Sequence, residues 1–366
     1  ATLTGHSSSV SAVAISPDGT WLATTSDDRT ARVWDRNTGR ETATLTGHTD
    51  KVRSVAISPD GTWLATTGND GTVRIWDRTT AGLTSHSRGV RAAAISPDGT
   101  WLATIGVDDG TMRTWDRTTG EETASLVGWV RAMAVAPDGT WLALGCDDHM
   151  VRIWDRATAS VTATLTAHSS PVSAVAISHD GGWIATAGYD GTVQVWDRTT
   201  DTETTLQTGT LVMTVAVSPD GTRLATGGID RTIRIWDRST ATVTATLTSS
   251  TGPTPLMTFS PDGTWLATGG VGPTAHIWDP ATANVTATLT GHIGAVRSVA
   301  ISPDGAWIGT TGDDKTLRIW DTSGEPVAMM RTDSPLICCC WSAGSDAIAA
   351  AGASGPYYFR FEPGTS

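Results

Sequence analysis

The sequence predicts an all-β protein, a single closed β-propeller of four-stranded antiparallel blades spanning residues 1–366. Three observations lead to this prediction. The dipeptide Trp-Asp occurs eight times, and successive pairs are 39 to 42 residues apart. Each interval contains short strand-like runs, and Gly, Pro and Asp turn signals separate these runs. A period of about 40 residues with four strands per unit is typical of blades repeated around a ring.

The second repeat shows the expected elements in order. Residues 42–48 form a short alternating strand, and residues 52–58 (VRSVAIS) form the innermost strand. A Ser-Pro-Asp-Gly turn follows, in which proline presets φ and glycine closes the turn. Residues 62–68 and 72–77 are the next two strands, joined by Asn-Asp-Gly. We expect this succession of hairpins in every repeat.

The last 45 residues contain no Trp-Asp pair but still divide into strand-like segments. These are Pro326–Arg331, Leu336–Ser342, Ala347–Ala351 and Tyr357–Phe361. Four of the six Tyr and Phe residues fall in the final segment, where aromatic rings replace the missing tryptophan. We therefore expect nine blades, closed by pairing of residues 2–4 with residues 357–361, which leaves no open sheet edge. The alternative is eight blades with a C-terminal appendage.

The combination of Gly-His, an aspartate in a tight turn and a terminal Trp-Asp resembles the WD-repeat (WD40) family over essentially the whole chain. The resemblance implies a ring whose innermost strands line a central channel. It also implies a hydrogen-bond network in each well-preserved repeat. Matched motif to motif, the networks comprise His6, Thr24, Asp28 and Trp34; His48, Thr66, Asp70 and Trp76; His86, Thr104 and Trp115; His168, Thr186, Asp190 and Trp196; and His292, Thr310, Asp314 and Trp320.

A His-Asp-Thr set could indicate a hydrolase, but here the set recurs in five repeats, whereas an enzyme needs one site. We interpret the networks as fasteners that stabilise the blades. The sequence has no P-loop and no GxSxG motif. We expect no catalytic residues, no cofactor and no metal site. The cysteines, Cys146 and the run 338–340, are interpreted as small buried apolar residues, which fits a reducing, cytoplasmic location.

Two recurring signals are interpreted as structural. A tryptophan follows most Ser-Pro-Asp-Gly turns, for example Trp63, and we expect it to pack between blades. An arginine follows most Trp-Asp pairs, for example Arg78, and we interpret the Asp-Arg pair as a solvated loop contact. The fourth, sixth and seventh repeats lack Gly-His, and we expect them to be less rigid or free for recognition. The alternative is that these repeats have drifted without consequence.

Propellers of the resembled family generally bind partners on the face that carries the loops before the innermost strand and after the second strand. Sequence differences between repeats concentrate at these positions, as recognition by loops requires. An arc rich in arginine adjoins a tryptophan, and an apolar arc contains two methionines. The predicted partner-binding residues are Lys51, Arg53, Asn69, Arg91, Trp129, Arg131, Tyr189, Leu211, Met213, Met257 and Arg297. The methionines could instead fill a widened channel mouth.

We expect a non-catalytic, monomeric scaffold that binds a protein or peptide with acidic and apolar portions. The acidic balance, 25 Lys+Arg against 37 Asp+Glu, argues against nucleic acid, and no apolar run is long enough for a membrane span. Composition and the start in mid-repeat suggest a domain cut from a bacterial signalling NTPase or Ser/Thr kinase. The alternative is a propeller lectin or small-ligand binder with pockets between blades.

Overall fold

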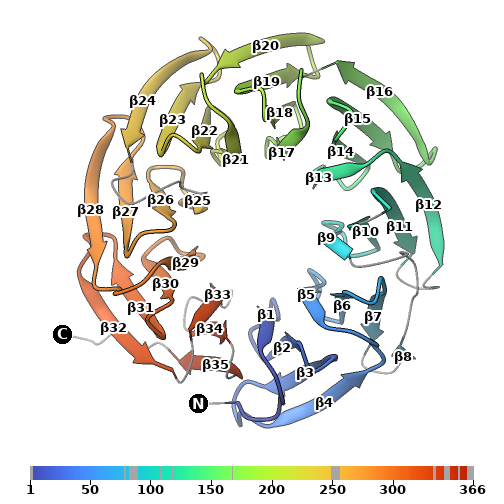
Figure 1. Ribbon diagram of the computed structural model, residues 1–366, viewed down its shortest axis with the longest axis vertical. Coiled ribbons are helices and arrows are strands. Elements are labelled where there is room, and N and C mark those ends of the chain that lie inside the picture. Colours follow the sequence, from blue (N-terminus) through green and yellow to red (C-terminus); the bar gives the residue numbers. More distant parts are fainter. Residues whose placement is uncertain are drawn as a thin grey trace.

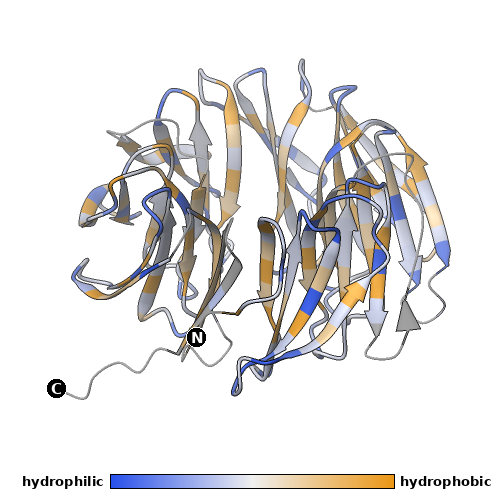
Figure 2. Ribbon diagram, turned by 60° about the horizontal axis from the view of Figure 1, so that its bottom comes forward, coloured by the Kyte–Doolittle hydropathy of each residue, from blue (hydrophilic) through white to orange (hydrophobic). Residues whose placement is uncertain are grey.

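The computed structural model is a ring of β-sheets that follow one another in sequence order around a common centre (Figure 1). It describes residues 3–77, 80–81, 90–107, 109–116, 119, 121–166, 168–248, 256–332, 335–341, 347–352 and 355–360. In each sheet the first strand in sequence is the innermost one, and later strands lie progressively farther out. Figure 2 shows that the strands run between two ends of the ring and that loops form both ends.

Eight sheets have four antiparallel strands, and we number them as blades 1 to 8. Blades 1 to 4 comprise β1 (Val10–Ile15), β2 (Trp21–Ser26), β3 (Thr30–Asp35) and β4 (Glu41–Thr46); β5 (Val52–Ile57), β6 (Trp63–Gly68), β7 (Val73–Asp77) and β8 (Thr80–Ala81); β9 (Val90–Ile95), β10 (Trp101–Gly106), β11 (Thr111–Asp116) and β12 (Glu122–Val127); β13 (Val130–Val135), β14 (Trp141–Cys146), β15 (Met150–Asp155) and β16 (Ser160–Thr166). Blades 5 to 8 comprise β17 (Val172–Ile177), β18 (Trp183–Gly188), β19 (Thr192–Asp197) and β20 (Thr202–Gln207); β21 (Val212–Val217), β22 (Arg223–Gly228), β23 (Thr232–Asp237) and β24 (Thr242–Thr248); β25 (Leu256–Phe259), β26 (Leu266–Gly269), β27 (Thr274–Asp279) and β28 (Asn284–Thr290); β29 (Val296–Ile301), β30 (Trp307–Gly312), β31 (Thr316–Asp321) and β32 (Pro326–Arg331).

The prediction of nine four-stranded blades is wrong, because the structure has eight. The C-terminal residues form only a three-stranded sheet, β33 (Leu336–Trp341), β34 (Ala347–Gly352) and β35 (Gly355–Arg360), which lies between blade 8 and blade 1. The expected fourth strand is missing among the described residues: residues 3–4 form no strand, and residue 2 lies outside the described part. Leu3 is instead buried against Trp34 of blade 1 and Ala347 and Ala349 of β34, so side-chain packing joins the chain ends.

Neighbouring blades share their apolar cores. Trp63 and Val73 of blade 2 pack with Leu102 and Trp115 of blade 3 in a single cluster, and clusters of the same kind join other pairs of blades. The tryptophan after the Ser-Pro-Asp-Gly turn is therefore an interblade residue, as the sequence predicted. Burying the roughly 200 Å² of an indole at about 25 cal/mol per Å² contributes about 5 kcal/mol before entropy costs.

The innermost strands contain a repeated irregularity. In blade 2, Val52 pairs with Gly68 and Ser54 pairs with Thr67, so Arg53 has no partner in the register. The same bulge falls at the second residue of the innermost strand in blades 1, 3, 4, 5, 6 and 8. Because a bulge re-aims a side chain, this position is set apart from the regular ladder. It holds several of the predicted partner-binding residues.

Candidate functional site

Three blades contain the complete predicted network. In blade 2, His48 Nε2 lies 2.8 Å from the Thr66 hydroxyl, and His48 Nδ1 lies 3.0 Å from the Asp70 carboxylate. The Trp76 indole N–H donates to Thr66 over 2.7 Å. The same contacts join His6, Thr24, Asp28 and Trp34 in blade 1, and His292, Thr310, Asp314 and Trp320 in blade 8. Each network ties loop, turn and strands of one blade together.

In blade 5 one predicted contact does not form. His168 lies 3.0 Å from Thr186 and 3.2 Å from Asp190, as predicted. The buried Trp196 indole nitrogen, however, has no hydrogen-bond partner within the described part of the protein. The network of blade 5 therefore lacks the hydrogen bond from its tryptophan.

Of the remaining blades, blades 3, 6 and 7 have the tryptophan contact, whereas blade 4 has Leu144 in place of the threonine. The Trp115 indole N–H donates to Thr104 over 3.0 Å in blade 3, where His86 lies outside the described residues. Blades 6 and 7 have the same contact, which we did not predict because these repeats lack Gly-His. The pairs are Trp236 with Thr226 at 3.0 Å and Trp278 with Thr268 at 2.8 Å.

A second threonine, which the sequence analysis missed, completes each histidine network. The Thr72 hydroxyl lies 2.8 Å from His48 Nδ1 and donates to Asp70 over 2.8 Å. Thr30, Thr192 and Thr316 occupy the same position in blades 1, 5 and 8. The signal was present in the sequence, because each of these threonines follows the turn aspartate by two residues.

The charge state of the networks fits a fastening role. Burial lowers the pKa of the four network histidines, in spite of the neighbouring carboxylates. Burial also acts to raise the pKa of Asp28, but hydrogen bonds from the Thr30 hydroxyl, the Ser7 N–H and His6 outweigh it and lower that pKa to about 2. A neutral histidine donates from Nδ1 to the aspartate and accepts the threonine O–H at Nε2. Because Thr66 is fully buried, its hydroxyl is also inaccessible to a substrate.

We predict that His168→Ala lowers the free energy of unfolding by about 1–3 kcal/mol, because it leaves the buried Thr186 hydroxyl without its histidine partner. Chemical denaturation measures this loss. The exposed His179 in the turn after β17 provides the control, since His179→Ala should leave the unfolding free energy unchanged. Equal effects of the two substitutions would contradict the fastening role.

Three of the arginines after the Trp-Asp pairs also contact a tryptophan ring, which the sequence interpretation did not include, although Arg156 and Arg198 are exposed loop residues as expected. The Arg198 guanidinium of blade 5 lies 3.9 Å from the Trp141 ring centroid of blade 4. The corresponding distances are 5.5 Å for Arg156 on Trp101 and 5.3 Å for Arg238 on Trp183. Each arginine thus covers the tryptophan of the preceding blade through a cation–π contact.

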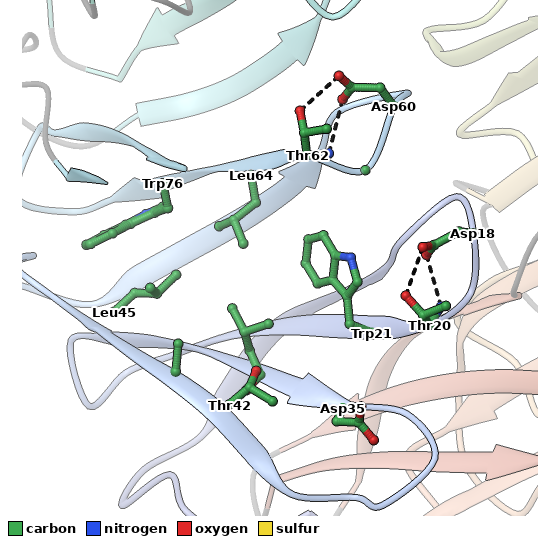
Figure 3. Close-up of a pocket in the computed structure, with 13 residues that line it drawn as sticks. Asp18, Thr20, Trp21, Asp35, Thr42, Leu45, Asp60, Thr62, Leu64 and Trp76 are labelled. Atoms are coloured by element: carbon green, nitrogen blue, oxygen red, sulfur yellow. Dashed lines mark hydrogen bonds between the residues drawn. The ribbon is translucent and has the colours of Figure 1, made fainter. Parts of the chain in front are cut away.

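A cleft of about 600 Å³ opens between blades 1 and 2. Figure 3 shows its two ends: Asp18 and Asp60 lie near Trp21 on the turn side, whereas Leu45 and Trp76 lie at the other end. The two aspartates accept hydrogen bonds from the adjacent threonine hydroxyls over 2.8 Å. A smaller cleft of about 310 Å³ between blades 4 and 5 is lined in part by Arg198.

The two sets of loops named in the sequence analysis do lie together, and we call this end of the ring the loop face. In blades 1, 2, 4, 5, 6 and 8 the backbone N–H of a residue after the second strand donates to a carbonyl of the loop before the innermost strand. Examples are Asn69 to Lys51 at 2.8 Å, Asp147 to Trp129 at 2.9 Å and Ile229 to Leu211 at 3.1 Å. The structure thus brings Lys51, Asn69, Trp129 and Leu211 to one end.

The basic side chains predicted on the loop face are engaged in ion pairs. Asp27 of blade 1 accepts from Lys51 over 2.7 Å and from Arg53 over 3.1 Å, which links blade 1 to blade 2. Arg53 also donates to Asn69 over 2.9 Å. Arg297 makes two bonds to Asp313, at 2.8 and 2.7 Å.

Arg131, also predicted on the face, pairs with Asp147 and lies 5.7 Å from the Tyr189 ring centroid. Nothing can be said of the Arg91 side chain, which lies outside the described part. Aspartates thus partly neutralise the predicted arginine arc.

Apolar side chains on the loop face are strongly exposed. Met213 and Ile229 of blade 6 are 45% and 50% exposed, Val271 of blade 7 is 63% exposed, and Ile293 of blade 8 is 85% exposed. We call these four residues the apolar arc; the sequence analysis missed Ile293. Trp129 on blade 4 is 57% exposed. Its backbone packs tightly on blade 3, since a Cβ at Gly110 would lie 2.6 Å from the Trp129 Cα.

Met257 does not belong to the loop face, contrary to the prediction. It pairs with Thr268 as Val215 pairs with Thr226 in blade 6, and it packs against the core cluster of blades 6 and 7. The position equivalent to Met213 is Pro255, which lies outside the described residues. Met257 therefore packs in the core. It neither binds a partner on the loop face nor fills the channel mouth.

Three exposed basic residues on the loop face adopt the left-handed backbone conformation. Arg29, Arg231 and Lys315 have φ of 70°, 68° and 66° in the turns after the second strands of blades 1, 6 and 8. Blades 2, 3 and 5 have Gly71, Gly110 and Gly191 at the same position, and blade 4 has His149 with a φ of 72°. A side chain there costs about 1 kcal/mol relative to glycine. We call Arg29, Arg231 and Lys315 the turn cations. The sequence analysis did not identify them, although each stands in the place of a glycine between the turn aspartate and the following threonine.

Two features are absent from the described residues. No group of three or more His, Cys, Asp and Glu side chains is arranged to hold a metal ion. No helix there is long and apolar enough to cross a membrane.

The comparisons with known proteins agree with this architecture. The family model WD40: WD domain, G-beta repeat matches residues 1–35, 39–77, 78–116, 120–155, 159–197, 202–237, 244–279 and 283–321. The crystal structure of the computationally designed Ika8 protein has a TM-score of 0.69 at 20% identity, over 98% of each chain, which shows the fold alone. The ribosome biogenesis protein ERB1 of Debaryomyces hansenii is 62% identical over 37 residues, 10% of this chain and 5% of that protein. The eight matched segments cover most of the sequence, and the chain therefore belongs to the WD40 family, whose propellers generally act as scaffolds for protein interaction.

Proposed function

We propose that this propeller is a non-catalytic interaction domain whose loop face binds an extended segment of a partner protein. The observation that carries the proposal is the apolar arc on neighbouring blades 6, 7 and 8. Four large apolar side chains exposed on adjacent loops at one end are typical of a binding surface rather than of scattered surface residues. Trp129 and Tyr189, on blades 4 and 5, add aromatic anchors to the same face.

The loop face can differ between blades because buried contacts stabilise the blades independently of these side chains. The bulge at the second residue of the innermost strand places Met213 outside the regular ladder. The contacts that stabilise the blade come from buried residues such as Thr226 and Trp236. A substitution in the apolar arc therefore changes recognition without loosening the blade.

The experiment compares two pairs of substitutions on immobilised protein. Met213→Ser with Ile229→Ser should remove most partner proteins that the wild type retains from a cell extract. Val285→Ser with Val327→Ser is the matched control, since these valines on outer strands are 42% and 41% exposed. Quantitative mass spectrometry reads out both. Loss of the same partners in the control, or retention of all partners by the first variant, contradicts the proposal.

A second candidate is a small-ligand or lectin function in the cleft between blades 1 and 2. The combination of the half-buried Trp21 ring with carboxylates in a cleft of about 600 Å³ favours it. Titration calorimetry with a panel of neutral and amino sugars tests it. Binding that disappears in Trp21→Ala but persists in the Met213→Ser, Ile229→Ser variant would identify this site instead of the loop face.

The proposed setting is a cytoplasmic bacterial signalling protein in which the propeller acts as a monomeric sensor beside an NTPase or Ser/Thr kinase domain. Its support is compositional: only two of the 25 basic residues are lysine, Lys51 and Lys315. The net charge of −12 supports a partner other than nucleic acid. Sequencing of the parent gene tests the setting, and a neighbouring domain of another class contradicts it.

A further inference from the structure

The stability of the fold does not explain why the turn cations occupy their positions. Glycine suits their backbone conformation better, and blades 2, 3 and 5 have glycine there. The three side chains are exposed, and none makes an ion pair or hydrogen bond among the described residues. Residues that keep an unfavourable backbone conformation without a structural contact point to a role in binding.

The carboxylates next to the turn cations are already occupied. Asp28 accepts from His6 and Thr30, and Asp314 accepts from His292 and Thr316. Asp230, directly before Arg231, accepts from Arg234 over 2.9 Å and from Thr232 over 2.7 Å. The turn cations are therefore not counter-ions of their neighbours. They differ in this respect from Arg53 and Arg297, which pair with aspartates on the same face.

Two of the turn cations, Arg231 and Lys315, also adjoin the apolar arc. Arg231 follows the exposed Ile229 by two residues in the same turn of blade 6. Lys315 lies in the turn of blade 8 whose network histidine directly precedes Ile293, and the Ile293 N–H donates to Asp314 over 3.0 Å. An unpaired cation thus stands beside an exposed apolar side chain at both ends of the arc. Val271 of blade 7 lies between them in the ring.

We propose that the loop face of blades 6 to 8 recognises an extended polypeptide segment in which carboxylates accompany apolar side chains. The inference rests on the proposed function of the loop face and specifies its partner. The carboxylates of the segment pair with Arg231 and Lys315, and its apolar side chains cover the arc. The net charge of −12 disfavours binding of an acidic peptide to the chain as a whole, so its binding to blades 6 to 8 depends on these local cations.

The test uses two labelled synthetic peptides, one of alternating leucine and glutamate and one of alternating leucine and glutamine. Fluorescence anisotropy measures their affinity for the wild type. We expect the glutamate peptide to bind at least about tenfold more tightly, with an advantage that shrinks as salt increases. Equal affinities, or no measurable binding of either peptide, overturn the proposal.

Glycine substitutions give a second readout that a structural role would not produce. Arg231→Gly and Lys315→Gly should each raise the midpoint of chemical denaturation, since glycine accepts the left-handed conformation. Each should also weaken binding of the glutamate peptide severalfold and leave the glutamine peptide unaffected. Arg40→Gly is the charge-matched control: Arg40 is exposed in the loop between β3 and β4, at the opposite end. Unchanged binding by both glycine variants overturns the proposal.

The two proposals fail in different ways. If the loop face binds proteins but does not read carboxylates, Met213→Ser with Ile229→Ser still removes partners from the cell extract, while the glycine variants bind like the wild type. If the loop face is not a binding surface, the serine variant retains every partner. The serine variant therefore tests the face, and the glycine variants test its preference.

Discussion

Replacing Trp101 by alanine should lower the free energy of unfolding by about 3–5 kcal/mol, the cost of emptying a large buried site. Trp101 of blade 3 is 1% exposed, packs with Leu142 and Trp154 of blade 4, and is covered by Arg156. The substitution removes contacts on both sides of an interblade boundary. Chemical denaturation followed by tryptophan fluorescence and far-UV circular dichroism measures the loss.

Trp129→Ala is the matched control for this prediction, because Trp129 is 57% exposed on the loop face. Its removal should change the unfolding free energy by less than about 1 kcal/mol, as for most surface substitutions. It should weaken partner binding instead. If Trp129→Ala destabilised the protein as much as Trp101→Ala, the separation between interblade and loop-face tryptophans would be wrong.

The stability of the protein should fall steeply as the pH drops below about 6.5, the ordinary histidine pKa. The pKa of the four network histidines is lowered by burial, so the native state stays neutral where the unfolded chain takes up protons. Each such histidine contributes stability that is complete above the unfolded pKa and is lost as the pH falls toward the native one. The slope for each histidine cannot exceed about 1.4 kcal/mol per pH unit, the limit for one whole proton taken up on unfolding.

The network aspartates act at lower pH. The pKa of Asp28, Asp70, Asp190 and Asp314 is lowered in the native state, so their contribution is present above about pH 4 and disappears below it. As the pH is lowered from 8 to 4, the unfolding free energy should therefore fall first through protonation of the histidines. His48→Gln should reduce the slope between pH 6.5 and pH 5 by about one proton. A flat profile above pH 5 would contradict the buried, neutral histidines.

The sequence predicts the blades well because their strand and turn signals are local. The expected strands 52–58 and 62–68 differ from β5 and β6 by a single residue at one end. The networks could also be located, since each member occupies a fixed place relative to the Trp-Asp pair. The C-terminal unit could not be predicted in the same way. Its closure depended on whether residues 2–4 reach β35, and that is a contact between distant segments.

The loop face was harder to predict because exposure and charge pairing depend on neighbouring blades. The pairing of Asp27 in blade 1 with Lys51 and Arg53 in blade 2 cannot be read from one repeat. Counted back from the Ser-Pro-Asp-Gly turn, the position of Met213 corresponds in the seventh repeat to Pro255 and not to Met257. The sequence does show a basic residue, Arg231, where other repeats have glycine. That this residue adopts the left-handed conformation is evident only from its φ of 68°.

The central claim is that fastening and recognition reside in different residues of the same blades. One crossed measurement tests it most directly: the unfolding free energy and the retention of partner proteins, determined side by side for His48→Ala and for Met213→Ser with Ile229→Ser. We predict that His48→Ala lowers the unfolding free energy by about 1–3 kcal/mol and leaves partner retention within a few-fold of wild type. The loop-face variant should do the reverse. Lost retention in His48→Ala with an unchanged unfolding free energy would contradict the account.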